Sequence, residues 1–241
     1  VLAHKNNIIV CNTPGVLDVS VAEHTFWLMG NLSRHVAYLD ARMRNGVLAG
    51  EAGAEMRGKL LRAVGSGPIG RRVARMAHFG FGMRVQALGF STVEQLQARE
   101  RRSLAEIQAT YGLECYTNDT DSLLPECDFV SVHLPATPDT HHFVNPDRLK
   151  LFKPGVFLVN TARGSVVDEA ALYDALNNGA LAGAALDVFA REPYEPVVPG
   201  KDLRRLANVL LTPHIGSNTR EANQRMAEAC LANVTHFFAG N

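Results

Sequence analysis

The stretch "LLRAVGSGPIGRRVARM" at residues 60–76 joins an apolar run to a helical pattern through a glycine-rich turn. Three of its glycines have the spacing G-x-G-x-x-G, and they are Gly65, Gly67 and Gly70. In a chain with 20 glycines this spacing can arise by chance. Arg62 also stands where a buried strand is normally apolar, and Pro68 removes an N–H that could face a phosphate. These residues alone leave two interpretations open: a phosphate-binding turn, or a turn that only lets a strand and a helix pack closely.

Short apolar runs alternate with helical patterns along the rest of the chain, which is typical of a parallel sheet with helices on both faces. The runs are almost continuously apolar, as in strands buried on both faces. They lie at 60–64, 83–88, 113–117, 128–134, 156–160, 183–189 and 208–212. The sequence therefore predicts an α/β fold with a doubly wound parallel sheet of the Rossmann type. In that fold the glycine turn leads from the first strand into a helix, where free N–H groups and the helix dipole favour a pyrophosphate.

Capping signals predict where the helices begin and end. The capping box at 20–23 opens a long helix whose apolar stripe ends at 45–46. A second box at 91–94 opens a helix that is expected to run to Gly112, and the last helix is capped at 218–221. Two more helix starts are predicted at Asn145 and Asp168.

Composition excludes several classes of function. The 24 basic and 24 acidic residues balance, so no overall charge attracts nucleic acid or an anionic membrane. No apolar run approaches the roughly 20 residues of a membrane span. Four scattered cysteines without a C-x-x-C pair indicate a reducing compartment, so a cytoplasmic location is expected. His133, His141 and His142 lack the carboxylate or thiolate spacing of a metal site, so no metal is predicted.

Five segments, in the same order and spanning essentially the whole chain, resemble the D-isomer-specific 2-hydroxyacid dehydrogenase family. They are "NTPGVLDVSVAEHT" (12–25), "DFVSVHLPATPDTHHFVN" (128–145), "NTARGSVVDEAAL" (160–172), "AGAALDVFAREP" (182–193) and "LLTPHIGSNT" (210–219). The resemblance implies an oxidoreductase that transfers a hydride between NAD(P) and a small 2-keto acid or D-2-hydroxy acid.

The resemblance also implies the catalytic residues Arg163, Glu192 and His214. Arg163 would hold the substrate's carboxylate and carbonyl oxygen, a task that suits a planar, always charged guanidinium. The alternative is a surface arginine paired with Asp168 or Glu169. His214 would be the general acid/base, because an imidazole with a pKa near ~6.5 exchanges protons at neutral pH. Glu192 would orient that imidazole and stabilise its charged form.

The residues implied to bind the cofactor are Gly65, Gly67, Pro68, Ile69, Gly89, Pro135, Thr140, Thr161, Ala162, Asp187 and Gly216. Asp187 is expected near the nicotinamide, although a residue at the end of a strand also commonly caps a turn. Gly89 stands where an Asp or Glu, roughly 20 residues past the glycines, normally binds the ribose hydroxyls of NAD. NAD is therefore expected and NADP is not excluded. Gly89→Asp should shift the preference toward NAD.

The resemblance implies three parts: residues 1–17 as a remnant of a substrate-binding domain, 18–216 as the dinucleotide-binding domain, and 217–241 as a C-terminal helix that returns toward the substrate domain. The chain begins at Val1 in "VLAHKNNIIVCNTPG", which we interpret as an N-terminally incomplete polypeptide.

A homodimer is also expected, on family resemblance. The predicted helix from Ser20 presents an apolar stripe through Phe26, Met29 and Val36, with Trp27 beside it. The alternative is that this stripe packs against the substrate domain.

The rival interpretation of function is a dinucleotide-sensing, corepressor-like binding module on the same fold, because fold alone does not define activity. The intact residues Arg163, Glu192 and His214 favour the enzyme, whereas the altered glycine turn and the missing acid favour the sensor.

Overall fold

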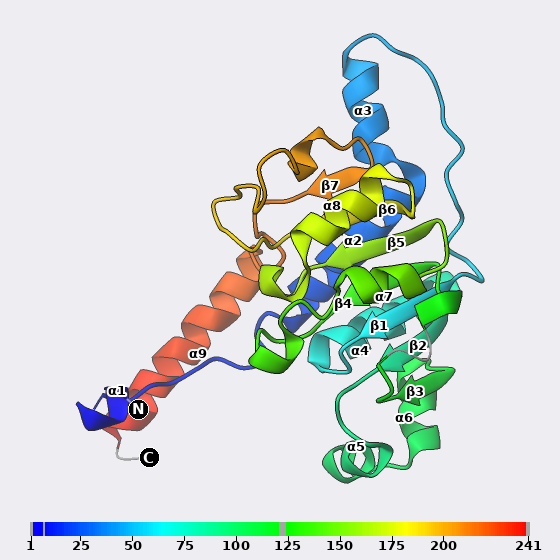
Figure 1. Ribbon diagram of the computed structural model, residues 1–241. Coiled ribbons are helices and arrows are strands. Elements are labelled where there is room, and N and C mark those ends of the chain that lie inside the picture. Colours follow the sequence, from blue (N-terminus) through cyan, green and yellow to red (C-terminus); the bar gives the residue numbers. More distant parts are fainter. Residues whose placement is uncertain (1, 7, 121–123, 240–241) are drawn as a thin grey trace.

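A seven-stranded parallel sheet forms the centre of the computed structural model, which describes residues 2–6, 8–120 and 124–239 (Figure 1). The strands are β1 (Leu60–Val64), β2 (Arg84–Leu88), β3 (Cys115–Thr117), β4 (Phe129–Val132), β5 (Val156–Asn160), β6 (Leu181–Leu186) and β7 (Val209–Leu211). Their order is β3-β2-β1-β4-β5-β6-β7. The strand order reverses direction between β1 and β4, and open α/β sheets bind ligands beyond the carboxyl ends at such a point. The predicted doubly wound Rossmann sheet is confirmed.

Helices cover both faces of this sheet (Figure 1). One face carries α2 (Asp18–Arg34), α4 (Pro68–Arg75) and α6 (Leu104–Tyr111), and the other carries α7 (Pro146–Leu151) and α8 (Glu169–Asn177). The remaining helices are α1 (Leu2–Lys5), α3 (Val36–Arg44), α5 (Val93–Glu100) and α9 (Arg220–Phe238). Single helical turns are η1 (Met76–Gly80), η2 (Leu124–Glu126), η3 (Pro138–Thr140), η4 (Gly164–Val166) and η5 (Leu203–Arg205).

Alternate side chains of each central strand enter opposite halves of the core. In β1, Leu60 and Val64 join the apolar cluster under α7 and α8, whereas Leu61 and Ala63 join the cluster under α2 and α4. Burial of one such aliphatic side chain stabilises the fold by about 1.5–3 kcal/mol. Arg62 points toward the first cluster and is 1% exposed, so its charge lies inside the protein rather than at a strand end.

The helix predicted from Ser20 to Asn45 differs from the observed one. It begins at Asp18, and the hydroxyl of Ser20 does not cap it but lies 2.8 Å from the hydroxyl of Thr219. His35 adopts a left-handed conformation (φ 55°) and divides the stretch into α2 and α3. The predicted capping box at 20–23 is therefore wrong, because a tertiary contact uses the serine.

The helix predicted from 91 to Gly112 also proves to be two helices. Thr92 rather than Ser91 caps α5, Arg101 has a φ of 52° and ends it, and Ser103 caps α6. At the last helix, Thr219 is the N-cap of α9 in place of Asn218. The predicted starts at Asn145 and Asp168 are confirmed, since both side chains accept hydrogen bonds from helical N–H groups.

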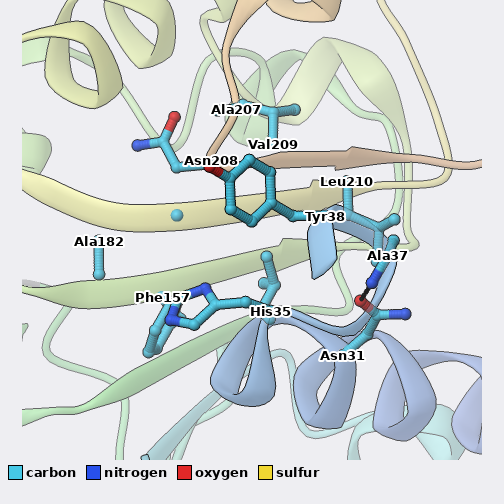
Figure 2. A pocket seen from close by; sticks show the side chains of 12 residues that line it. Asn31, His35, Ala37, Tyr38, Phe157, Ala182, Ala207, Asn208, Val209 and Leu210 are labelled. Carbon is cyan, nitrogen blue, oxygen red and sulfur yellow. Dashed lines mark hydrogen bonds between the residues drawn. The ribbon is translucent and has the colours of Figure 1, made fainter. Parts of the chain in front are cut away.

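A small hollow of about 40 Å³ lies at the amino ends of the strands, where the joint between α2 and α3 meets β5, β6 and β7 (Figure 2). The Asn31 side chain accepts a hydrogen bond from the N–H of Ala37 there and fixes the joint. The hollow lies at the edge opposite to the one where open α/β sheets bind ligands. In the part of the chain that the structure describes, no helix is long and apolar enough to cross a membrane.

Candidate active site

The glycine turn after β1 is open on the side where a phosphate would lie and closely packed on the opposite side. Gly65 has a φ of +106°, and a Cβ there would be 2.5 Å from the carbonyl oxygen of His133. A Cβ on Gly70 would be 2.0 Å from the carbonyl oxygen of Gly65. At Gly67, the N-cap of α4, a Cβ would meet nothing within 4 Å. The turn is thus tightly packed behind and open in front of a helix N-terminus, which fits the pyrophosphate of a dinucleotide.

A cleft of about 470 Å³ opens at the carboxyl ends of the strands, in front of this turn. Its lining includes ten residues predicted for the site: Gly67, Pro68, Ile69, Pro135, Thr161, Ala162, Arg163, Asp187, His214 and Gly216. Four predicted residues, Gly65, Thr140, Gly89 and Glu192, lie outside this lining. Gly65 forms the back of the turn, Thr140 donates a 2.5 Å hydrogen bond to the carbonyl oxygen of Pro135, and Glu192 binds His214.

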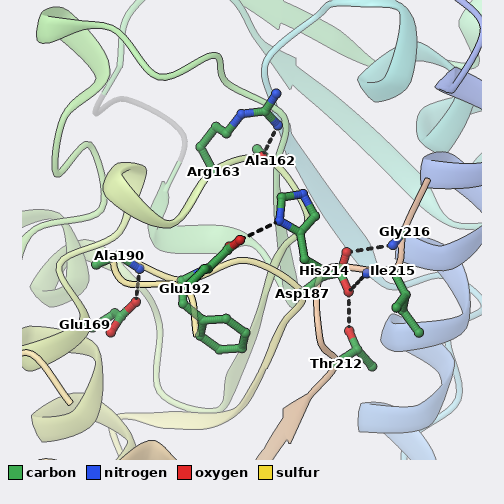
Figure 3. Close-up of polar contacts among 11 residues, drawn as sticks. Ala162, Arg163, Glu169, Asp187, Ala190, Glu192, Thr212, His214, Ile215 and Gly216 are labelled. Atoms are coloured by element: carbon green, nitrogen blue, oxygen red, sulfur yellow. Dashed lines mark hydrogen bonds and ion pairs between the residues drawn. The ribbon is translucent and has the colours of Figure 1, made fainter. Parts of the chain in front are cut away.

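His214 and Glu192 form a hydrogen-bonded pair although 22 positions separate them (Figure 3). Nδ1 of His214 lies 2.8 Å from Oε2 of Glu192, while the N–H of Phe189 donates to Oε1. Burial raises the pKa of Glu192, but the hydrogen bonds from His214 and Phe189 outweigh it, so the pKa of the carboxyl is lowered overall. A carboxylate that stays ionised favours the tautomer with its proton on Nδ1, which leaves Nε2 free to face a ligand.

Asp187 fixes the loop that carries His214. Its carboxylate accepts hydrogen bonds from the N–H groups of Ile215 (2.9 Å) and Gly216 (2.8 Å) and from the hydroxyl of Thr212 (2.6 Å). Burial raises the pKa of Asp187, yet the hydrogen bonds lower it further than burial raises it. Between these anchors His214 has a φ of 53°, a region that non-glycine residues rarely adopt. Asp187 therefore lines the cleft and also caps the turn, so both roles considered for it are compatible.

Arg163 extends from the loop after β5 along the wall of the cleft (Figure 3). Its Nη1 donates a 2.6 Å hydrogen bond to the carbonyl oxygen of Ala162, and the Asn160 amide holds the backbone on both sides. Among the contacts described, no ion pair links Arg163 to Asp168 or Glu169. The arginine thus lies where a ligand can reach it, rather than in the surface ion pair considered as the alternative.

Several residues that line the cleft were not predicted from the sequence. From the segment before α2 come Thr13, Gly15 and Leu17, from the first turn of α2 Asp18 and Val21, and from other loops His133, Leu134 and Ser217. The "NTPG" segment was a signal for the first group. His24 was missed too: its Nε2 lies 3.2 Å from the Thr212 hydroxyl and 3.3 Å from the Asp187 carboxylate.

The histidines and aspartates that line the cleft do not form a metal-binding group among the described residues. In residues 2–6, 8–120 and 124–239, no group of three or more His, Cys, Asp or Glu side chains is placed to hold a metal ion. His133 has a different environment, since burial lowers its pKa to about 4 and its Nε2 lies 2.9 Å from the Ser131 hydroxyl. A neutral imidazole at this point adds no positive charge to the cleft at physiological pH.

A dinucleotide-binding sheet with a carboxylate–imidazole pair and an arginine on its cleft is the arrangement of a nicotinamide-dependent oxidoreductase. Residues 26–216 match the family described as "D-isomer specific 2-hydroxyacid dehydrogenase, NAD binding domain". A glyoxylate reductase of Thermococcus litoralis is 40% identical over 99% of this chain and 69% of its own length.

Solved structures agree with these matches. A D-lactate dehydrogenase from Aquifex aeolicus, complexed with NAD and lactic acid, has a TM-score of 0.82 and 32% identity, over 99% of this chain and 72% of that one. An acyclic imino acid reductase in complex with NADPH and D-Arg has a TM-score of 0.80 and 29% identity, over 99% and 71%. The chain belongs to the D-isomer specific 2-hydroxyacid dehydrogenase family. It is an NAD(P)-dependent oxidoreductase of the 2-hydroxyacid dehydrogenase class.

Proposed function

We propose that the protein interconverts a small 2-keto acid and the corresponding D-2-hydroxy acid, with His214 as general acid/base, Glu192 as its partner and Arg163 as the clamp for the substrate's carboxylate. The observation that carries the proposal is the 2.8 Å contact between His214 and Glu192 at the cleft that Arg163 also lines. The names of similar proteins, glyoxylate reductase and glyoxylate/hydroxypyruvate reductase B, support a substrate of two or three carbons.

NAD(P), when bound, supplies or accepts the hydride. The residues of this chain bind and orient the substrate and exchange the proton. In the direction of reduction, protonated His214 donates its Nε2 proton to the carbonyl oxygen of the keto acid. The Glu192 carboxylate stabilises the imidazolium before the transfer and keeps the ring oriented after it. Arg163 neutralises the substrate carboxylate and directs the carbonyl toward His214, since its fork binds two oxygens at once. In oxidation the same nitrogen takes the proton back.

Replacement of the two proton-transfer residues tests this assignment. His214→Ala should lower kcat about 10²–10⁴-fold with glyoxylate or hydroxypyruvate, which is the usual contribution of a positioned acid/base. Glu192→Gln removes the negative charge that favours the imidazolium. Reduction by Glu192→Gln should therefore be slower than reduction by the unmodified protein. Steady-state kinetics measure both effects.

Binding of NADH to each variant, followed by fluorescence, shows that the cofactor site is intact. A kcat of His214→Ala equal to that of the unmodified protein would exclude His214 as the acid/base. The same assays decide against the corepressor-like module if the unmodified protein turns over either substrate.

The terminal segments support a proposed division into three parts, with 18–216 as the dinucleotide-binding domain. Residues 1–17 and 217–241 would belong with a substrate-binding part. Arg225 of α9 donates a 2.9 Å hydrogen bond to the carbonyl oxygen of Val16, and Asn233 donates to that of Asn12. The N-terminal segment and α9 extend together away from the sheet (Figure 1). Exposed apolar residues lie on both segments: Ile8, Ile9, Val10, Leu231, Val234, Phe237 and Phe238.

We propose a homodimer as well, with the outer surface of α2 and the protruding α3 as the interface. Trp27 is 78% exposed beside an apolar groove of about 440 Å³. A cytoplasmic location is the accompanying proposal, supported by the free thiols of Cys11, Cys115 and Cys230.

A further inference from the structure

A side chain at the position of the missing acid after β2 would overlap two neighbouring side chains, which would have to move to admit it. A Cβ on Gly89 would lie 2.3 Å from the hydroxyl oxygen of Tyr116 and 2.8 Å from that of Ser66. Tyr116 comes from the neighbouring strand β3, and the residue is 6% exposed in the core under α4 and α6. Ser66 belongs to the glycine turn itself. The acid is thus not merely absent: two hydroxyl groups occupy the space into which its side chain would project.

We propose that Tyr116 and Ser66 are specificity-determining residues that replace the ribose-binding carboxylate with two neutral hydroxyls, so that the site accepts NADH and NADPH with similar affinity. The inference rests on the proposed function, because it assumes that the glycine turn holds a dinucleotide. In this arrangement Tyr116 also compels residue 89 to be a glycine.

The two hydroxyls have different hydrogen-bonding capacity. Tyr116 donates its proton to the carbonyl oxygen of Ser91 at 2.7 Å, so its oxygen is left to act mainly as an acceptor. An acceptor suits a ribose hydroxyl, which donates, and not a phosphate, which accepts. The hydroxyl of Ser66 rotates and can donate to either group. Tyr116 therefore favours NADH, and Ser66 serves both cofactors.

The guanidinium of Arg71, next to Ser66, already has protein partners. Arg71, on the first turn of α4, forms a 2.6 Å ion pair with Glu100 of α5 and donates a 2.7 Å hydrogen bond to the carbonyl oxygen of Ser66. Both side chains of this ion pair are 15% exposed. Glu100 also lies 3.5 Å from Nε of Arg99, so two guanidiniums share this carboxylate. The Arg71 side chain is directed to Glu100 and to the carbonyl oxygen of Ser66, and these two contacts compete with a 2′-phosphate for its N–H donors. Neutral groups discriminate weakly, which predicts dissociation constants for NADH and NADPH within about tenfold of each other.

In this proposal Gly89→Asp alone does not give the full shift toward NAD that the sequence leads us to expect. An aspartate Cβ cannot occupy its place until the Tyr116 ring moves, and the ring is fixed by the core and by its bond to Ser91. The double variant Gly89→Asp/Tyr116→Val supplies both the carboxylate and the space for it.

Titration of NADH and NADPH by fluorescence tests the proposal on the whole chain. Tyr116→Phe should weaken NADH about two- to tenfold and NADPH less, as loss of one neutral hydrogen bond implies. Ser66→Ala should weaken NADPH at least as much as NADH. Gly89→Asp alone should shift the ratio of the two dissociation constants less than about tenfold, and the double variant more than tenfold toward NADH. Tyr38→Phe on α3, the same chemical change far from the turn, is the matched control and should leave both constants unchanged.

The outcomes separate this proposal from the function on which it rests. Tyr116→Phe and Ser66→Ala that bind both nucleotides like the unmodified protein would overturn it, as would a full shift toward NADH in Gly89→Asp with Tyr116 intact. These conservative variants decide the matter even if the double variant fails to fold. An unmodified protein that binds neither nucleotide would overturn the proposed function itself, and this inference with it.

Discussion

Arg62 carries a guanidinium into the middle of β1, where it is 1% exposed. Its partner is Gln86, which stands opposite in the register with β2 and accepts a hydrogen bond from Nη2. Burial lowers the pKa of Arg62 to about 10, which still keeps the side chain charged at neutral pH. Burial of a charge costs less where it is hydrogen-bonded, so the amide of Gln86, which accepts from Nη2, has a structural role that its strand position alone does not reveal.

Gln86→Leu should destabilise the fold by about 1.5–3 kcal/mol, because it removes an acceptor from a charged donor. The double variant Arg62→Met/Gln86→Leu should regain most of this loss, since an apolar pair of similar volume replaces the polar one without a buried charge. Urea denaturation of the three proteins measures the difference. If Gln86→Leu unfolds at the same urea concentration as the unmodified chain, the bond to Arg62 contributes nothing to stability.

At the scale of single residues, the sequence predicted the position of a site residue best where its side-chain chemistry and its place in a motif indicated the same role. Arg163 and His214 both line the cleft, as their places after β5 and β7 suggested. The predicted role of Glu192 depended wholly on the family resemblance, because a carboxylate beside a proline in a loop belongs to no periodic pattern. Tyr116 was invisible for another reason: its function as a neighbour of Gly89 depends on the pairing of β2 with β3, which no local pattern encodes.

At the scale of elements, all seven predicted strands are present, because buried parallel strands have an apolar signal that neighbours rarely disturb. The helix boundaries were less predictable. His35 and Arg101 divide two predicted helices by adopting positive φ values, which residues other than glycine adopt too rarely to be predicted at a given position. A capping box at 20–23 satisfied the local rule, yet the contact of Ser20 with Thr219 outweighed it.

Two loops of the site are locked together by Gly164. A Cβ at this position would lie 1.9 Å from the carbonyl carbon of Phe189 and 2.4 Å from the nitrogen of Ala190. The same N–H of Ala190 donates a 2.6 Å hydrogen bond to Glu169, whose buried second oxygen has no hydrogen-bond partner among the described residues. The loop that carries Glu192 is thereby held against the loop that carries Arg163.

Gly164→Ala should therefore displace the Glu192 loop and lower kcat at least tenfold, with a loss of stability of about 1–3 kcal/mol from overpacking. Gly80→Ala is the matched control, because a Cβ there meets nothing within 4 Å and the glycine lacks a positive φ. Thermal unfolding and steady-state kinetics report the two effects separately. A Gly164→Ala protein with unchanged kinetics would mean that the contact between the loops does not position the catalytic pair.

At the scale of the whole molecule, the predicted apolar stripe of the first helix divides between core and surface. Phe26 and Met29, expected to lie on one exposed stripe with Val36, are 6% and 0% exposed and pack into the core. Val36 on α3 is 52% exposed, and Trp27 on the outer side of α2 remains open. Helical periodicity identifies which residues share a face, but it does not tell whether that face meets the sheet or another molecule.

The proposed homodimer follows from what remains uncovered. Trp27 borders the groove formed with Phe26, Met56, Met76 and Phe81, and α3 projects from the body with Met43 65% exposed (Figure 1). An apolar surface of this kind on a folded protein usually marks an interface. We expect the unmodified chain to sediment as a dimer at micromolar concentration. Trp27→Asp should convert it to a monomer, because a charge would be buried without a partner.

Leu231→Asp is the control for that experiment, since Leu231 is 68% exposed on α9, which extends away from the sheet and from α3 (Figure 1). It should leave the dimer intact. Folding of each variant is checked by its circular dichroism spectrum, so that a loss of association is not confused with a loss of structure. If the unmodified chain sediments as a monomer while it binds NADH, the groove beside Trp27 does not join two copies. The alternative weighed for this surface, contact with a substrate-binding domain, would then account for its apolar character.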